Sequence, residues 1–285
     1  MMNGRRVIYR MVTISAFADE ISPNLDEQLD VLESEAIHHV ELRGVWNKNV
    51  LDLSDEELRH VRKTLMERGF RVSSIGSPIG KIAITDDFES HLQRFERALS
   101  IASYLDTRFI RVFSFFMPHS ILPDQYRDEV LTHMSELVRL AEAADIVLLH
   151  ENEKQIYGDI PERCLDILTT CQSDHLKAVF DPANFVQCDV QPFHRAFPLL
   201  KPYVEYLHIK DAVFAGHHVV PAGEGDGQLL ELLATMLHDG YDGFVSLEPH
   251  LDHASAFQGF SGPDLFKVAS QALKHLLTRL NQDWQ

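Results

Sequence analysis

The chain has 285 residues, of which 45% are apolar and 24% charged, ordinary values for a globular protein that exclude wholesale disorder. Its 43 acidic and 26 basic residues give a formal net charge of −17. This balance argues against a nucleic-acid partner, because such a binder needs a positive surface to displace counterions from phosphates. No apolar run approaches the roughly 18 residues of a membrane-spanning helix, so we expect no membrane partner.

The cysteines and the N-terminal segment indicate the cellular compartment in which the protein is expected. Cys164, Cys171 and Cys188 form no CxxC pair, which favours free thiols in a reducing environment. The first ten residues are basic but no long apolar run follows them, so we predict neither a signal peptide nor an anchor. We therefore expect a cytoplasmic protein. The first strand signal follows Met11, and residues 1–11 are expected to be an N-terminal extension of the fold.

Short β-rich runs alternate with longer helical patterns along the chain. The eight expected strands cover residues 12–17, 38–43, 71–76, 108–113, 145–151, 177–181, 204–210 and 243–248. The expected helices cover residues 24–36, 54–68, 88–105, 123–144, 159–172, 190–200, 226–238 and 262–282. Helix boundary signals support this pattern: Ser54 and Glu57 form a predicted capping box, and Gly69 and Gly240 follow their helices as C-caps.

This strict alternation predicts parallel strands joined by right-handed crossovers. Eight such units favour closure into a barrel over an open doubly wound sheet, and barrels of this kind typically need about 250 residues. The first strand-to-helix turn lacks a GxGxxG fingerprint, so a dinucleotide-binding fold has no support there. The sequence predicts a single (β/α)8 TIM barrel, with one domain over residues 1–285.

The ends of the last four expected strands carry the most informative residues, because active sites of such barrels lie where strands end. These residues are Glu151, Asp181, His208 and Glu248. Each alone has an ordinary explanation, such as a helix cap or an ion pair. Together, three carboxylates and an imidazole converging at one rim require a compensating cation. Three oxygen ligands and one nitrogen ligand suit Mn, Mg, Co or Zn, so we predict one divalent metal ion.

Other polar residues follow the same strands. Strand alternation places Lys210 on the side of His208, and Glu153 on the side of Glu151. Lys210 is expected either to bind a substrate hydroxyl or carboxylate, or to pair with a nearby acid such as Asp211. Two further residues, Glu41 and Arg43, end the second strand and form either an ion pair or substrate contacts.

Five strings, HENEKQIYGD, FDPANF, YLHIKDA, PAGEGDG and VSLEPH, resemble those of the xylose-isomerase-like TIM barrels. That superfamily includes sugar isomerases, ketose 3-epimerases, inosose dehydratase and zinc-dependent abasic-site endonucleases, and the resemblance spans about residues 12–280. It implies that Glu151, Asp181, His208 and Glu248 bind the metal, and that Glu151 and Glu248 also act as acid and base. It further implies a substrate contact from His217, on the loop after the seventh strand.

Two departures from the family pattern narrow the range of activities that we expect. The epimerases usually carry a histidine three residues after the aspartate of the sixth strand, where this chain has Asn184. Asn184 keeps a polar substrate contact but does not titrate. The endonucleases need several more histidine ligands, and histidines are absent from the ends of the third and fourth strands. A nuclease is therefore not expected.

We accordingly expect a divalent-metal-dependent sugar isomerase or 3-epimerase that transfers a proton through an enediolate. Glu151 and Glu248 are the expected catalytic groups, and the expected substrate contacts are Asn184, Lys210, His217 and Glu153. The alternative is a metal-dependent dehydratase of a keto-polyol such as an inosose, which begins with the same proton abstraction and then expels a hydroxyl. A barrel that binds a sugar without converting it is a third possibility, and a homo-oligomer is compatible with the sequence.

The glycine-rich string PAGEGDG bears on the substrate's charge. Phosphate-binding barrels use loops after the seventh and eighth strands, where backbone N–H groups meet the anion. This loop has suitable glycines, but Glu224 and Asp226 would oppose a phosphate. A phosphate would be favoured by three nearby basic residues, Lys210, His217 and His218. We expect an unphosphorylated sugar or polyol.

Overall fold

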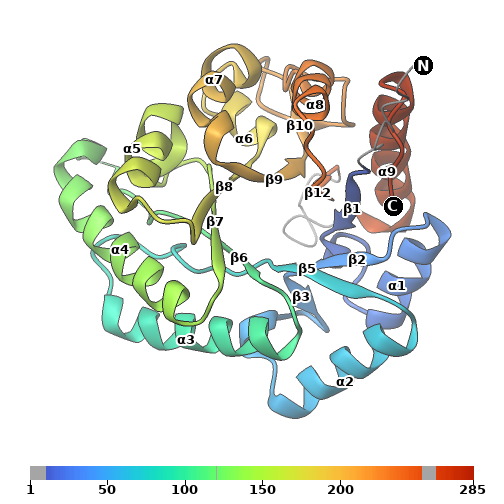
Figure 1. Ribbon diagram of the computed structural model, residues 1–285, viewed down its shortest axis with the longest axis horizontal. Coiled ribbons are helices and arrows are strands. Elements are labelled where there is room, and N and C mark those ends of the chain that lie inside the picture. The colour runs from blue at the N-terminus through green and yellow to red at the C-terminus, as the bar shows by residue number, and fades with distance from the viewer. Residues whose placement is uncertain (1–10, 120, 252–260) are drawn as a thin grey trace, which may run out of the picture.

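The computed structural model describes residues 11–119, 121–251 and 261–285. Within these residues, eight parallel strands close into a barrel in the order β1-β12-β9-β8-β7-β6-β5-β2, with helices around the outside (Figure 1). The strands are β1 (Thr13–Ala16), β2 (His39–Leu42), β5 (Arg71–Ile75), β6 (Phe109–Val112), β7 (Val147–Glu151), β8 (Leu176–Phe180), β9 (Val204–Ile209) and β12 (Phe244–Leu247). The predicted (β/α)8 barrel is confirmed.

The outer helices follow the expected positions closely. They are α1 (Leu25–Ser34), α2 (Asp55–Glu67), α3 (Phe88–Tyr104), α4 (Arg127–Ala143), α5 (Pro161–Cys171), α7 (Phe197–Leu200), α8 (Leu229–His238) and α9 (Gly262–Arg279). The capping box of α2 is present: Glu57 N–H donates to Ser54 Oγ at 3.2 Å, and Ser54 N–H donates to Glu57 Oε2 at 2.8 Å. Gly69 and Gly240 have φ angles of 75° and 88°, as left-handed C-caps require.

Five segments of the described chain differ from the expected pattern. The helix expected at 190–200 is a π-helical turn, Pro192–Ala196, followed by the short α7. Pro198 lies inside the expected helix and lacks the N–H group that a continuous helix needs there. A 3₁₀ turn, Pro123–Tyr126, precedes α4. Short elements were not expected in the loops: α6 (Pro182–Val186) and the hairpins β3 (Gly44–Val45) with β4 (Lys48–Asn49) and β10 (Asp211–Ala212) with β11 (Val219–Val220).

The main apolar core lies between the barrel and its helices, and a smaller cluster fills the barrel interior. The interior cluster contains Phe109, Val147, Leu149, Val179 and Tyr206. It forms an apolar floor beneath the polar residues at the C-terminal ends of the strands. None of the helices within the described ranges is long and apolar enough to cross a membrane. The predicted extension falls outside the described residues except for Met11, which is exposed.

Candidate metal centre

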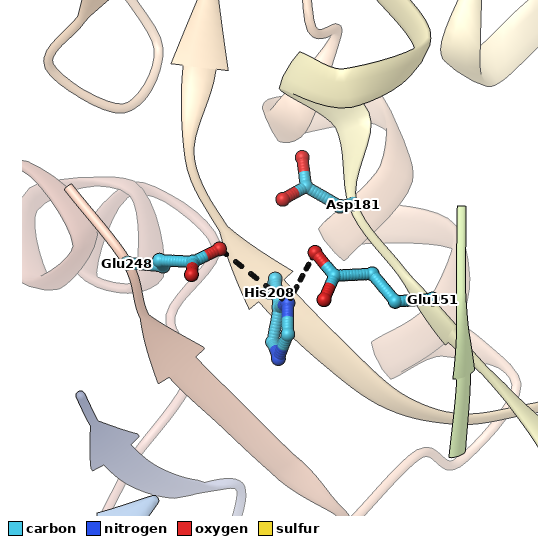
Figure 2. A group of neighbouring side chains, drawn as sticks. All are labelled: Glu151, Asp181, His208 and Glu248. Carbon is cyan, nitrogen blue, oxygen red and sulfur yellow. Dashed lines mark ion pairs between the residues drawn. The ribbon is translucent and has the colours of Figure 1, made fainter. Parts of the chain in front are cut away.

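Four side chains converge at the C-terminal mouth of the barrel (Figure 2). Glu151 is the last residue of β7, Asp181 follows β8, His208 lies in β9 and Glu248 follows β12. All four are buried, and one possible ligand atom from each lies within 4.8 Å of the others. The structure thus brings together the four residues predicted from the strand ends.

Strand alternation explains why these side chains point inward. Side chains two residues apart on a strand share a face. Leu149, Val179 and Tyr206 belong to the interior cluster, so Glu151, Asp181 and His208, two residues further along, lie on the same inward face. The apolar layer therefore lies one step below the ligand layer.

His208 connects the glutamates. Its Nδ1 atom lies 3.2 Å from Glu151 Oε1 and 3.8 Å from Glu248 Oε2, and its Nε2 atom lies 3.3 Å from Glu41 Oε2. Burial alone would lower the pKa of His208, but Glu41 and Glu151 outweigh burial and raise that pKa to about 10. Glu41 therefore contacts the ring nitrogen opposite the ligand cluster, the position of a carboxylate that orients a metal-bound histidine.

Three buried or half-buried cations hold the carboxylates together. Lys210 Nζ lies 2.8 Å from Asp181 Oδ2 and 3.1 Å from Glu248 Oε2. Arg111 Nη1 lies 3.2 Å from Glu151 Oε2 and 3.5 Å from Glu248 Oε1. Arg43 Nη1 lies 2.9 Å from Glu248 Oε1 and is 20% exposed.

These cations set the ionisation of the carboxyls. Burial would raise the pKa of Glu151, but His208 and Arg111 lower it to about 2. Burial would likewise raise the pKa of Glu248, yet its cationic neighbours, Lys210 first among them, hold it well below the ordinary range. For Asp181 burial dominates and raises the pKa to about 6, despite the contact with Lys210. The two glutamates are therefore carboxylates at neutral pH.

The cluster fits a divalent cation. Glu151 Oε2, Asp181 Oδ2 and His208 Nδ1 are buried and lack a hydrogen-bond partner within the described part of the chain, although charged groups lie at ion-pair distance. Unsatisfied buried atoms of this kind are costly unless they bind an ion. Three carboxylates and one imidazole are the donor set that Mn, Mg, Co or Zn prefers. This buried group could hold a metal ion.

Asn184 and Asp181 are joined by the unexpected helix α6. Asp181 caps this helix, accepting a hydrogen bond from Asn184 N–H at 2.9 Å through Oδ1. Asp181 Oδ2 therefore remains directed to the cluster, toward Lys210. The Asn184 amide donates to Glu151 Oε1 at 3.1 Å and to the Asn152 carbonyl at 2.9 Å. Asn184 thus orients Glu151 without adding a titratable group.

The predicted substrate contacts occupy different positions. Lys210 is 95% buried and lies within the cluster, where its Nζ atom contacts Asp181 and Glu248. Glu153 contacts Lys81 at 3.1 Å in the loops after β5 and β7, and exposed His217 contacts Asp189 at 3.0 Å. Asn184 and Lys210 therefore lie against the ligand group, whereas the contacts of Glu153 and His217 are with residues outside it.

Lys210 pairs with acids of the rim, as one of its two predicted roles required, but its partners are Asp181 and Glu248 rather than Asp211. Buried Asp211 instead accepts hydrogen bonds from four backbone N–H groups, those of Ala212, Gly223, Gly225 and Gly227 at 2.8 to 3.1 Å. The glycine N–H groups that could have bound a phosphate thus donate their hydrogen bonds to the Asp211 carboxylate. A Cβ atom on residue 225 would lie only 2.4 Å from Asp211 Oδ1, which explains why this position holds a glycine.

Arg111 was not anticipated from the sequence. It lies in β6 two residues from Phe109, so alternation in the string RFIRVF already indicates an inward cation. Its guanidinium lies 4.9 Å from the ring centroids of both Phe17 and Phe113. Arg43 contacts the Phe17 ring at 4.6 Å, and Lys81 contacts the Phe113 ring at 4.2 Å. Cations and aromatic rings therefore alternate along the mouth beside Glu151 and Glu248.

Three acidic and imidazole groups around Arg43 and Glu248 were also missed. Arg43 pairs with Asp19 at 2.7 Å and with Glu20 at 2.6 Å, and His250 lies 3.0 Å from Glu20 and 3.6 Å from Glu248. Asp19 and Glu20 lie in the 3₁₀ turn after β1, where sequence alternation gives no direction for a side chain. Arg43 therefore pairs with Asp19, Glu20 and Glu248, and Glu41 contacts His208, in place of the ion pair between Glu41 and Arg43 that the sequence suggested.

Comparison with known proteins identifies relatives with the same fold. The family model for xylose isomerase-like TIM barrels matches residues 29–277. A 3-dehydroshikimate dehydratase of Bacillus anthracis is 20% identical over 243 residues, covering 82% of this chain and 85% of that protein.

Solved structures agree with this match. A D-tagatose 3-epimerase-like protein has a TM-score of 0.76 at 18% identity, covering 95% of this chain and 98% of its own. A xylose isomerase-like TIM barrel protein from Mycobacterium smegmatis, in complex with magnesium, has a TM-score of 0.70 at 17% identity, covering 96% of this chain and 97% of its own. At these identities the structural likeness establishes the fold.

Proposed function

The chain belongs to the xylose isomerase-like TIM barrel family, and from this premise we propose that it is a divalent-metal-dependent sugar isomerase or 3-epimerase. The observation that carries the proposal is the buried group of Glu151, Asp181, His208 and Glu248, with possible ligand atoms within 4.8 Å of one another. The two glutamates lie on either side of His208 (Figure 2). When bound, the ion would supply a Lewis acid that stabilises negative charge developing on substrate oxygens.

Glu151 and Glu248 are the proposed proton-transfer groups. Moving a proton beside a carbonyl needs a base that reaches the carbon, and both side chains are carboxylates at neutral pH because nearby cations lower their pKa values. One glutamate removes the proton from carbon to give an enediolate, and the same or the other glutamate returns it. General acid–base assistance of this kind is typically worth roughly 10²–10⁴-fold.

The proposed substrate is a small unphosphorylated sugar or polyol. Lys210 Nζ and the Asn184 amide lie against the ligand group. Lys210 can donate a hydrogen bond to a substrate hydroxyl, and Asn184 Oδ1 can accept one. We retain Glu153 and His217 as proposed contacts from the loops after β7 and β9. The glycine N–H groups of the loop after β9 donate to Asp211, which supports an unphosphorylated substrate for a reason other than the charges of Glu224 and Asp226.

A dehydratase of a keto-polyol is the second candidate. Two observations favour it: the similar Bacillus anthracis protein is named a dehydratase, and Asn184 replaces the histidine usual in epimerases. The reaction would begin with the same proton abstraction. The hydroxyl expelled from the neighbouring carbon would then need a proton, for which Lys210 is a suitable donor because it is cationic and buried in the cluster.

One experiment separates these activities. Metal-loaded protein is incubated in D₂O with ketoses and, separately, with keto-polyols, and the products are followed by NMR. An isomerase or epimerase should incorporate deuterium at the carbon beside the carbonyl and form a sugar of unchanged composition. A dehydratase should form an enone or dienol product lacking one water. Conversion without any exchange of that hydrogen would refute the enediolate route.

A further inference from the structure

A cavity lies at the opposite end of the barrel from the candidate metal centre. It has a volume of about 730 Å³, within the roughly 300–1,000 Å³ usual for small-molecule sites. Its lining includes the first residues of four strands, namely His39 of β2, Arg71 of β5, Phe109 of β6 and Phe244 of β12. Because the barrel strands are parallel, these residues mark the N-terminal end, whereas the metal-ligand candidates mark the C-terminal end.

The charge of the cavity is opposite to that of the chain. Arg62, Arg71 and Arg108 line it, and none contacts a carboxylate among the residues that the structure describes. Most other described arginines and lysines do make such a contact. Asp106 is the one acidic residue of the lining. Three arginines and one aspartate leave an excess of two positive charges in a protein whose formal charge is −17.

The floor of the cavity is apolar and aromatic. The rings of Phe109 and Phe244 lie edge to face with centroids 6.4 Å apart, and the His39 ring lies 5.4 Å from that of Phe244. Burial, together with Arg71, lowers the pKa of His39, so its ring is neutral. His39 Nδ1 is buried and has no hydrogen-bond partner within the described ranges. The cavity thus combines a cationic rim with an apolar, aromatic floor.

We propose that this cavity binds a small organic phosphate, a phosphate monoester carrying an apolar ring or chain. The excess of two positive charges matches the charge of about −1.5 to −2 on such a phosphate. Guanidinium groups bind its oxygens through paired N–H donors, and partly buried Phe244 offers apolar surface to the rest of the molecule. A monocarboxylate would leave one positive charge unmatched. The site is separate from the proposed catalytic centre, for which we propose an unphosphorylated substrate.

Phenyl phosphate is the probe, because it has a dianionic group and one apolar ring. Isothermal titration into metal-loaded protein at about 0.15 M salt, in a buffer without phosphate, should give a Kd of about 1 mM or tighter. Phenol and inorganic phosphate should each bind at least about tenfold more weakly, because each offers only one of the two features. The double variant R71Q/R108Q should bind phenyl phosphate at least about tenfold more weakly than the wild type.

The double variant R59Q/R279Q is the matched control. Arg59 and Arg279 are exposed, lie outside the cavity lining and contact no carboxylate among the described residues, so the loss of charge is the same. This control should bind like the wild type. Absence of wild-type binding up to about 10 mM, unchanged affinity in R71Q/R108Q, or equal weakening in both double variants would each overturn the proposal. Thermal unfolding checks that both variants fold, which their exposed positions favour.

Discussion

Glu248 is the carboxylate of the centre with the most cationic neighbours. Arg43 and Arg111 approach its Oε1 atom at 2.9 and 3.5 Å, and Lys210 approaches Oε2 at 3.1 Å. These contacts fix its orientation and keep it ionised. Replacing Glu248 with a side chain of the same shape should therefore affect proton transfer more than side-chain packing.

Glu248→Gln should keep the fold and lower kcat by at least about 10²-fold, because the amide has the same shape but cannot accept the proton. The measurement is kcat at saturating metal, with metal content determined in parallel so that a weaker ion affinity is not mistaken for a lost base. Circular dichroism serves as the folding control. Turnover within tenfold of the wild type at full metal occupancy would show that Glu248 is not a proton-transfer group.

His208 should make metal binding depend on pH. In the metal-free protein Glu41 and Glu151 raise its pKa to about 10, and a protonated imidazole cannot be a ligand. Each ion bound at neutral pH should therefore release about one proton, and the Kd for Mn²⁺ should fall about tenfold per pH unit from about pH 7 to 9. Titration calorimetry in buffers of different ionisation enthalpy counts the protons. A Kd independent of pH over this interval would contradict the assignment.

The four ligand candidates were predictable because their positions depend on strand ends, which alternation and turn signals locate within one or two residues. Their cationic partners were harder to predict. Alternation in β6 places the Arg111 side chain on the inward face, but Arg43 and the acids that pair with it, Asp19 and Glu20, lie beyond strand ends. There the direction of a side chain depends on loop conformation, which local sequence patterns do not determine.

At the scale of elements, regular segments were predicted well and loop structure was not. The capping box of α2 and the glycine C-caps located helix ends, since each depends on a few neighbouring residues. The expected helix over 226–238 begins only at Leu229. The reason is tertiary: Gly225 and Gly227 donate their N–H groups to Asp211, fourteen and sixteen residues earlier in the chain.

Asp211→Asn tests this carboxylate. It should lower the free energy of unfolding by at least about 3 kcal/mol, because four backbone N–H groups lose a charged buried acceptor, and charged hydrogen bonds contribute about 1.5–3 kcal/mol each. Urea unfolding measures the change. Asp226→Asn is the matched control, since exposed Asp226 accepts one bond, from Phe214 N–H, and should cost less than about 1 kcal/mol. Equal effects of the two changes would argue against a structural role for Asp211.

At the scale of the whole molecule, the barrel separates two chemically different ends. The C-terminal mouth holds acids and cations in close pairs around the candidate metal ligands, whereas the N-terminal cavity holds arginines without carboxylate contacts in the described residues. Net charge did not reveal this second site, because a formal charge of −17 is a sum over the chain and contains no information on how charges are distributed.

The ligand set also links metal binding to the stability of the whole barrel. Its members come from β7, β8, β9 and β12, which are consecutive neighbours in the barrel but are separated by long stretches of sequence. The unfolded chain cannot bring them together, so an ion held by these residues would bind the folded state almost exclusively. Free metal at about 100 times its Kd should then stabilise the fold by about 2.7 kcal/mol, which corresponds to a rise in Tm of about 5 °C. Thermal unfolding with and without chelator measures this difference, and His208→Ala should reduce it to near zero. A wild-type Tm that does not respond to chelation would mean that these four side chains do not hold an ion in the folded protein.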